Sequence, residues 1–120
     1  MTVEALRSIV TSLVPSERNG LDVLLISMDP ERDTPQALSQ LARERHVSDP
    51  HWTFARTSAP ETRRIAAALG IQYRQLPSGD FEHSTELLLL DANGRIRARS
   101  SQLSAPDPEF VRAIRGTLKN

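Results

Sequence analysis

The stretch that decides the fold is Leu21–Thr34, with the sequence LDVLLISMDPERDT. Its centre, 23–26, is a short apolar run with β-branched residues, which is typical of a strand buried on both faces. The strand, expected at about 21–28, must end in the polar residues that run from Ser27 to Pro30. The sequence from Asp33 to Pro35 then predicts a helix start, because a capping side chain is followed by proline at the first helical position. Ligands and chemistry in open α/β sheets are usually found at such a strand end.

Working outward, hydrophobic periodicity and turn residues predict the remaining elements. We expect helices at 3–14, 35–45, 59–69 and 108–118, a short extended segment at 52–56, and strands at 85–90 and 95–100. Ser58 and Asp107 are the expected N-caps of the last two helices, and Gly70 is expected to end the helix before it. Asn93 and Gly94 predict a hairpin between the last two strands. Residues 15–20 are expected to be a loop, and residues 71–82 irregular.

This order predicts an α/β protein with a thioredoxin-like fold in a single domain spanning 1–120. A thioredoxin-like sheet has a central strand before its first helix, whereas this chain begins directly with a helix. We therefore expect an N-terminally truncated domain in which that strand is missing. The strands at 21–28 and 85–90 would then each expose an edge, and would either pair with each other or be joined by another chain.

Composition excludes several classes of function. Fifteen basic and fifteen acidic residues give no net charge, so nothing favours nucleic acid or an anionic membrane as a partner. The chain has no cysteine, which excludes disulfides, thiolate metal ligands and thiol nucleophiles. The N-terminal sequence lacks a basic segment followed by a continuous apolar one, so it is not a signal peptide, and a chain made as written would stay in the cytoplasm.

Few residues offer chemistry. His83 precedes the strand at 85–90, where it is either a structural residue or a metal ligand or proton carrier. The carboxylates of Asp29, Glu31 and Asp33 form an acidic loop that either caps the next helix or faces a second group across the end of the sheet. The two other histidines match no metal-binding spacing and are predicted to be surface residues: His46 and His51.

Four segments together resemble the Sco/SenC family of thioredoxin-like copper proteins, which serve in assembling the copper centre of cytochrome c oxidase. They are ISMDPERDTPQALSQLA (26–42), HWTF (51–54), IAAALGIQYRQ (65–75) and FEHSTELLLLDANGRI (81–96). The similarity extends from about Thr2 to Ser100. Its most specific part is the sequence DPERDT joined to a later His-Ser pair.

The resemblance implies a copper site made of two cysteines, spaced Cys-x-x-x-Cys, and one distant histidine. The histidine corresponds to His83, and Asp29 and Asp33 would lie near the metal and tune it by charge. The family usually has aspartate before its histidine, where this chain has Glu82. The cysteines belong at the start of the first helix, just before the residues with which this chain begins. The interpretation is a truncated product, an alternative start or a shortened gene model, in preference to a natural cysteine-free relative.

Two functions from different classes follow. The first is a Sco/SenC-like copper-binding and thiol-redox protein with a cytochrome c oxidase subunit or another copper or redox protein as partner. Copper would be held weakly or not at all by this chain, through His83. The second is a non-catalytic thioredoxin-like module that docks an assembly partner without metal. An enzymatic function is not expected, because thiol chemistry needs a cysteine. The family is typically membrane-anchored and periplasmic, and self-association through the exposed strand edges is a further expectation.

Overall fold

The computed structural model describes residues 2–79, 81–83 and 86–119, and the side chains of residues 73 and 81–83 lie outside that description. The chain forms two compact units. One comprises residues 1–22 and 85–120, and the other comprises residues 23–84. The prediction of a single domain over 1–120 is not tested by this division and stays a prediction.

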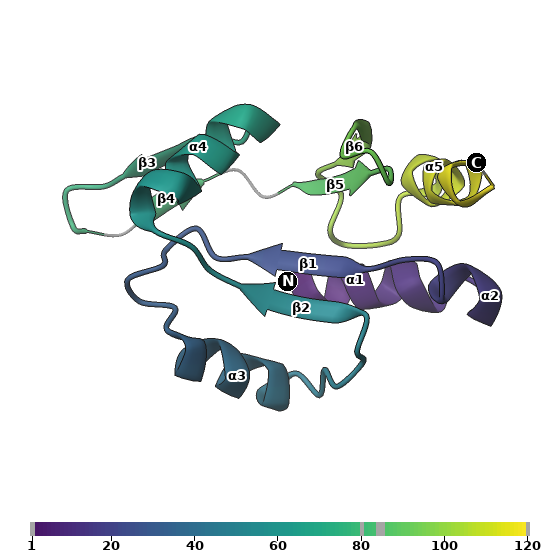
Figure 1. Cartoon of the computed structure of the whole chain (residues 1–120), viewed down its shortest axis with the longest axis horizontal. Helices are drawn as coiled ribbons and strands as arrows, with labels where there is room; N and C mark the ends of the chain where they lie inside the picture. The colour runs from purple at the N-terminus through teal and green to yellow at the C-terminus, as the bar shows by residue number, and fades with distance from the viewer. Residues whose placement is uncertain (1, 80, 84–85, 120) are drawn as a thin grey trace. The chain divides into compact units, whose positions relative to one another are not determined.

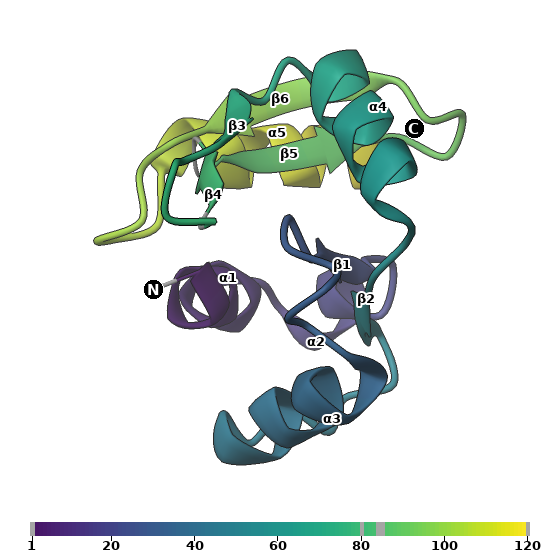
Figure 2. The ribbon, with the colours of Figure 1, turned by 90° about the vertical axis from the view of Figure 1, so that its left-hand side faces the viewer.

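The first unit contains a two-stranded antiparallel sheet and three helices. Its elements are α1 (Thr2–Thr11), α2 (Pro15–Arg18), β5 (Leu87–Leu90), β6 (Ile96–Ser100) and α5 (Pro108–Leu118). Helix α5 contacts both strands and runs alongside them in the two views (Figures 1 and 2). The hairpin and the last helix therefore form where the sequence predicts them.

The core of this unit is formed by α1, β5 and α5. Alternate residues of β5 point inward, so that Leu87 and Leu89 are buried while Leu90 is exposed. They join a buried cluster with the apolar stripes of the helices: Ile9, Leu13, Phe110, Val111 and Ile114. This arrangement is the expected one for a strand with one covered face.

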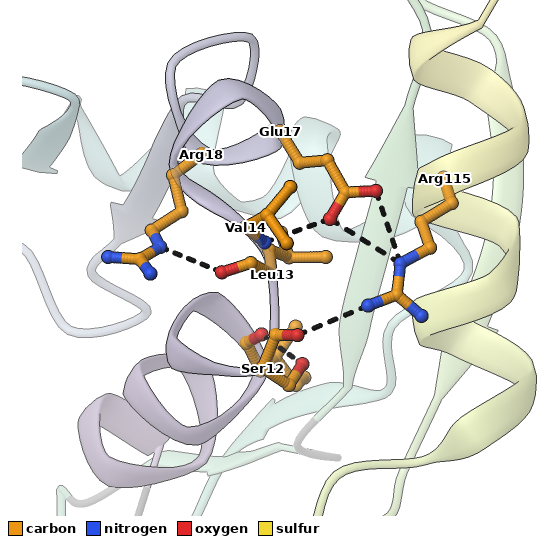
Figure 3. Close-up of polar contacts among 7 residues, drawn as sticks. Ser12, Leu13, Val14, Glu17, Arg18 and Arg115 are labelled. Carbon is orange, nitrogen blue, oxygen red and sulfur yellow. Dashed lines mark hydrogen bonds and ion pairs between the residues drawn. The ribbon is translucent and has the colours of Figure 1, made fainter.

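Arg115 ties the two ends of the chain together in this unit. Its guanidinium donates to the Glu17 carboxylate, with Nε 3.2 Å from Oε2, and to the Ser12 carbonyl oxygen at 3.1 Å (Figure 3). Glu17 also accepts a hydrogen bond from the Val14 N–H at 2.9 Å, which caps the short helix α2. The residues at 15–20 are therefore partly helical, whereas the sequence predicts a loop, because this cap stabilises a single turn behind Pro15.

The second unit contains two separate two-stranded sheets and two helices. Its elements are β1 (Val23–Ile26), α3 (Pro35–Glu44), β2 (Trp52–Ala55), α4 (Ala59–Leu69), β3 (Tyr73–Gln75) and β4 (Phe81–His83). Strands β1 and β2 are parallel, with Val23 opposite Trp52 and Ile26 opposite Ala55. Helix α3 connects these strands and contacts β2, as Figure 1 shows.

The helix boundaries of this unit follow the predicted caps. Thr34 accepts a hydrogen bond from the Ala37 N–H at 3.1 Å, and Ser58 accepts one from the Glu61 N–H at 3.2 Å. Gly70 adopts the left-handed conformation that ends α4, with φ of 71°. His46 has the same conformation after α3, with φ of 56°. A β-carbon makes this conformation costly, so α3 ends less favourably than α4.

Two predictions for this unit are wrong. Residues 71–82 are not irregular, because β3 and β4 form an antiparallel hairpin in which Gln75 lies opposite Phe81 and Tyr73 opposite His83. These strands have three residues each and several charged side chains, so they lack a clear apolar alternation. Leu24 is 60% exposed, although the run was predicted to be buried on both faces. Strand β1 has one ladder neighbour within its unit, β2, which leaves fewer groups to cover this side chain.

Candidate metal centre

The acidic loop follows β1 and is organised by the Ser27 hydroxyl. The Ser27 N–H donates to the Ala55 carbonyl at 2.9 Å and so extends the pairing of β1 with β2. The Ser27 hydroxyl donates to Asp33 Oδ2 at 2.6 Å and accepts from the Asp29 N–H at 3.0 Å. Both predicted carboxylate positions are thus fixed to the end of the strand by one side chain.

Backbone hydrogen bonds close the loop into a turn. The Asp29 carbonyl accepts from the N–H groups of Arg32 and Asp33, at 3.2 and 3.0 Å. The Arg56 guanidinium, from the segment after β2, donates to the carbonyl of Pro30, which is buried. The loop is therefore held from two directions, and its conformation does not depend on a bound ion.

The two carboxylates differ in their partners. Asp33 receives a short hydrogen bond from a hydroxyl group, whereas Asp29 pairs with Arg32, with Oδ2 3.5 Å from Nε. The Arg32 side chain is 58% exposed, so this ion pair is screened by water and contributes little to stability. Asp33 is an internal hydrogen-bond acceptor of the loop, and Asp29 is the carboxylate whose partner exchanges more easily.

His83 is placed by its backbone. It is the last residue of β4, in register opposite Tyr73, and belongs to the same unit as the acidic loop. Its side chain lies outside the described part of the structure, so its predicted role as a metal ligand is neither confirmed nor contradicted. The predictions for Asp29 and Asp33 as charges near a metal are likewise untested.

The other two histidines lie in the segment between α3 and β2. His46 is exposed, and its backbone N–H donates to the Arg43 carbonyl at 3.1 Å. The His51 N–H donates to Asp49 Oδ1 at 2.8 Å, and its carbonyl accepts from the Val23 N–H. These backbone contacts have a local structural role.

The donor set does not match a thiolate copper site. The sequence contains no cysteine. Among the described residues, no three histidine, aspartate or glutamate side chains are grouped so that they could hold a metal ion. Copper(I) prefers soft sulfur ligands and imidazole to carboxylates, and the loop offers carboxylates that already have protein partners. The described residues therefore do not fit the site that the family resemblance implies.

Comparison with a family model places the chain. The model described as SCO1/SenC matches residues 1–119. The chain belongs to the SCO1/SenC family. Among the described residues, no helix is long and apolar enough to cross a membrane. A search of curated protein sequences finds no match.

Solved structures of family members share the fold. The copper-bound ScoI of Bradyrhizobium japonicum aligns with a TM-score of 0.72 at 19% identity, covering 94% of this chain and 71% of its own. A SCO1/SenC family lipoprotein from Bacillus anthracis aligns with a TM-score of 0.78 at 17% identity, covering 94% and 69%. The copper-bound ScoI of Arabidopsis thaliana aligns with a TM-score of 0.67 at 22% identity, covering 96% and 69%. These alignments confirm the predicted thioredoxin-like α/β class.

Sequence reasoning missed two residues of the SCO1/SenC acidic loop. Ser27 was set aside because nothing near it in sequence suggested an activated hydroxyl, yet it holds both ends of the loop. Arg32 was treated as part of a motif and not as a contact, yet it pairs with Asp29. A serine at the end of a strand, followed by aspartates, is a pattern that could have indicated the first of these, since such hydroxyls bond nearby backbone groups.

Proposed function

We propose that this chain represents a Sco-type copper-handling protein that serves the assembly of the cytochrome c oxidase copper centre, and that this chain is itself deficient in copper binding. Membership of the SCO1/SenC family carries the first part of the proposal, and two family members with the same fold are described with copper bound. The absence of cysteine from the sequence carries the second part.

His83 supplies the residual affinity in this proposal. It is the position that corresponds to the family histidine, and neutral imidazole is a ligand that copper accepts. Asp29 and Asp33 contribute negative charge close to the end of β1. A single imidazole without thiolates holds Cu(I) weakly, because the remaining coordination positions fall to water or to distant groups.

Copper titration of the 120-residue chain tests this proposal. With a chromophoric Cu(I) chelator as competitor, we expect the chain to lose Cu(I) to the chelator. We expect His83→Ala to lower the remaining affinity by about tenfold, which corresponds to roughly 1.4 kcal/mol. His46→Ala and His51→Ala serve as matched controls and should leave it unchanged. Tight Cu(I) binding that persists in His83→Ala would contradict both the deficiency and the assigned ligand.

A second candidate is a metal-free docking module, which the engaged carboxylates favour. Asp33 is bonded to Ser27 and Asp29 to Arg32, so the loop is ordered by protein contacts alone. In this alternative, His83→Ala leaves partner binding unchanged. A loss of partner binding in this variant that copper cannot restore would mean that His83 belongs to the docking surface itself.

The proposed partners are a cytochrome c oxidase subunit or another copper or redox protein, together with a second copy of this chain through strand edges. The lipoprotein from Bacillus anthracis supports a membrane-anchored or periplasmic location for the family's work. Cross-linking in native membranes, followed by mass spectrometry, distinguishes these partners. We expect links to an oxidase-assembly protein, whereas links confined to soluble cytoplasmic proteins would contradict the proposed partner and location.

A further inference from the structure

One side chain of the second unit contacts two of its segments, and that side chain is Arg32. On one side, its Nε lies 3.5 Å from Asp29 Oδ2 in the acidic loop. On the other side, its Nη2 lies at the turn between β3 and β4, because a β-carbon placed on Gly79 would be 3.7 Å from this atom. That separation is an ordinary van der Waals contact. The guanidinium thus lies between the acidic loop and the hairpin that carries His83.

The turn at this contact has a defined backbone. Gly79 has φ of 93°, a conformation that side chains with a β-carbon rarely adopt. Its N–H donates to the Leu76 carbonyl at 2.9 Å, and its carbonyl accepts from the Gln75 side-chain amide at 3.3 Å. The position of the turn is therefore transmitted directly to the start of β4.

The hairpin needs an external contact to stay ordered. It has only three paired positions, from Gln75 opposite Phe81 to Tyr73 opposite His83, and an isolated two-stranded hairpin is marginally stable in water. A guanidinium suits this task because its planar fork can pair with a carboxylate on one edge and lie against backbone with the other. An ammonium group on lysine, being a point charge, cannot maintain both contacts.

We propose that Arg32 is a positioning residue that holds the β3–β4 hairpin, and with it the strand of His83, against the loop that carries Asp29 and Asp33. The inference rests on the proposed function only in its use of His83 as the metal-binding residue. The contact itself requires no metal. Arg32 thereby sets where the imidazole-bearing strand lies relative to the two carboxylates.

Amide hydrogen exchange measured by NMR on the metal-free chain tests this proposal. We expect Arg32→Ala to speed exchange at the β3–β4 amides by about two- to fivefold, the size expected for one partly exposed contact, and to shift the His83 amide resonance. Arg32→Lys should keep the pairing with Asp29 but lose the protection of the hairpin. Arg64→Ala is the matched control, because Arg64 makes an exposed ion pair with Glu61 in the same unit, and it should leave the hairpin unchanged.

Three results would overturn the proposal. Unchanged hairpin exchange in Arg32→Ala would mean that the contact is passive. Faster exchange throughout residues 23–84 would mean a general loss of stability and no specific positioning. Full protection in Arg32→Lys would mean that charge alone suffices. Because no metal is added, each of these results leaves the copper proposal standing, and a failed copper titration leaves this one standing.

Discussion

Leu13→Ala is expected to lower the free energy of unfolding by about 3–4 kcal/mol, the usual cost of truncating a leucine in a packed core. Leu13 is 2% exposed and packs in the cluster formed by α1, β5 and α5. Its carbonyl accepts a hydrogen bond from Arg18 Nε at 2.9 Å, so the backbone cannot move inward to fill the cavity. Urea unfolding followed by circular dichroism measures the loss.

Leu24→Ala is the matched control, because it removes the same atoms from a side chain that is 60% exposed. We expect a change of no more than about 0.5 kcal/mol, as for other surface substitutions. Equal losses in the two variants would contradict the described core, since they would mean that Leu24 is as well covered in solution as Leu13.

Asp107→Ala is expected to destabilise the C-terminal part of the first unit. The Asp107 carboxylate accepts from the N–H of Glu109 at 3.0 Å and from that of Phe110 at 3.5 Å, which caps α5. It also accepts from the Ser100 hydroxyl at 2.8 Å, and so connects the helix to the end of β6. The substitution removes all three bonds at once, and thermal unfolding should show a lower midpoint. A midpoint equal to that of the wild type would contradict this role.

The effect of Asp107 depends on pH in a defined direction. The hydrogen bond from Ser100, together with those from the backbone N–H groups, holds the pKa of Asp107 below its ordinary value. Its stabilisation is therefore fully present above the pKa of an unfolded aspartate, about 3.9, and is lost as the pH falls through the lower folded pKa. The difference between wild type and Asp107→Ala should be constant from about pH 5 to 8 and should shrink below about pH 4.

Asp91 must be separated from this effect. Hydrogen bonding from the Arg95 N–H, with smaller contributions from Asn93 and Arg97, also lowers the pKa of Asp91. Because Asp91 is present in both proteins, its contribution cancels when wild type and Asp107→Ala are compared at the same pH. Asp107→Asn completes the set, since it keeps a capping oxygen but removes the charge. It should retain part of the stability and lose the pH dependence.

Local signals predicted most of the secondary structure correctly. The caps at Thr34, Ser58 and Asp107 start helices because short polar side chains satisfy N–H groups that no helix carbonyl can reach. Asn93 and Gly94 lie in the turn between β5 and β6 because Gly94 adopts φ of 79°. These features depend on residues close in sequence, so they could be identified from the sequence alone.

The errors occurred where tertiary contacts decide. The β3–β4 hairpin has too few residues to show an alternating pattern, and its turn is contacted by Arg32 from a distant part of the chain. The one-turn helix α2 depends on Glu17, which is held by Arg115, 98 residues away in sequence. The exposure of Leu24 depends on how many strands cover β1. None of these distances can be calculated from local propensity.

The candidate site was predicted in part. The sequence identified the loop and both carboxylates, but it could not distinguish Asp33, which accepts from Ser27, from Asp29, which pairs with Arg32. Both residues have the same side chain and the same neighbourhood in sequence. Only the direction in which each carboxylate points separates an internal acceptor from a residue that faces an exposed cation.

The ion pair between Arg115 and Glu17 has a consequence for biosynthesis. The first unit is formed by both ends of the chain, with residues 23–84 between them, so its core cannot close until the ribosome has delivered α5. The apolar stripe of α1 emerges first and waits for its partners through nearly the whole of translation. The second unit, by contrast, has all its residues once position 84 is synthesised. Closing so long a loop slows folding, and exposed apolar surface favours aggregation, which makes the nascent N-terminal helix the segment most in need of a chaperone.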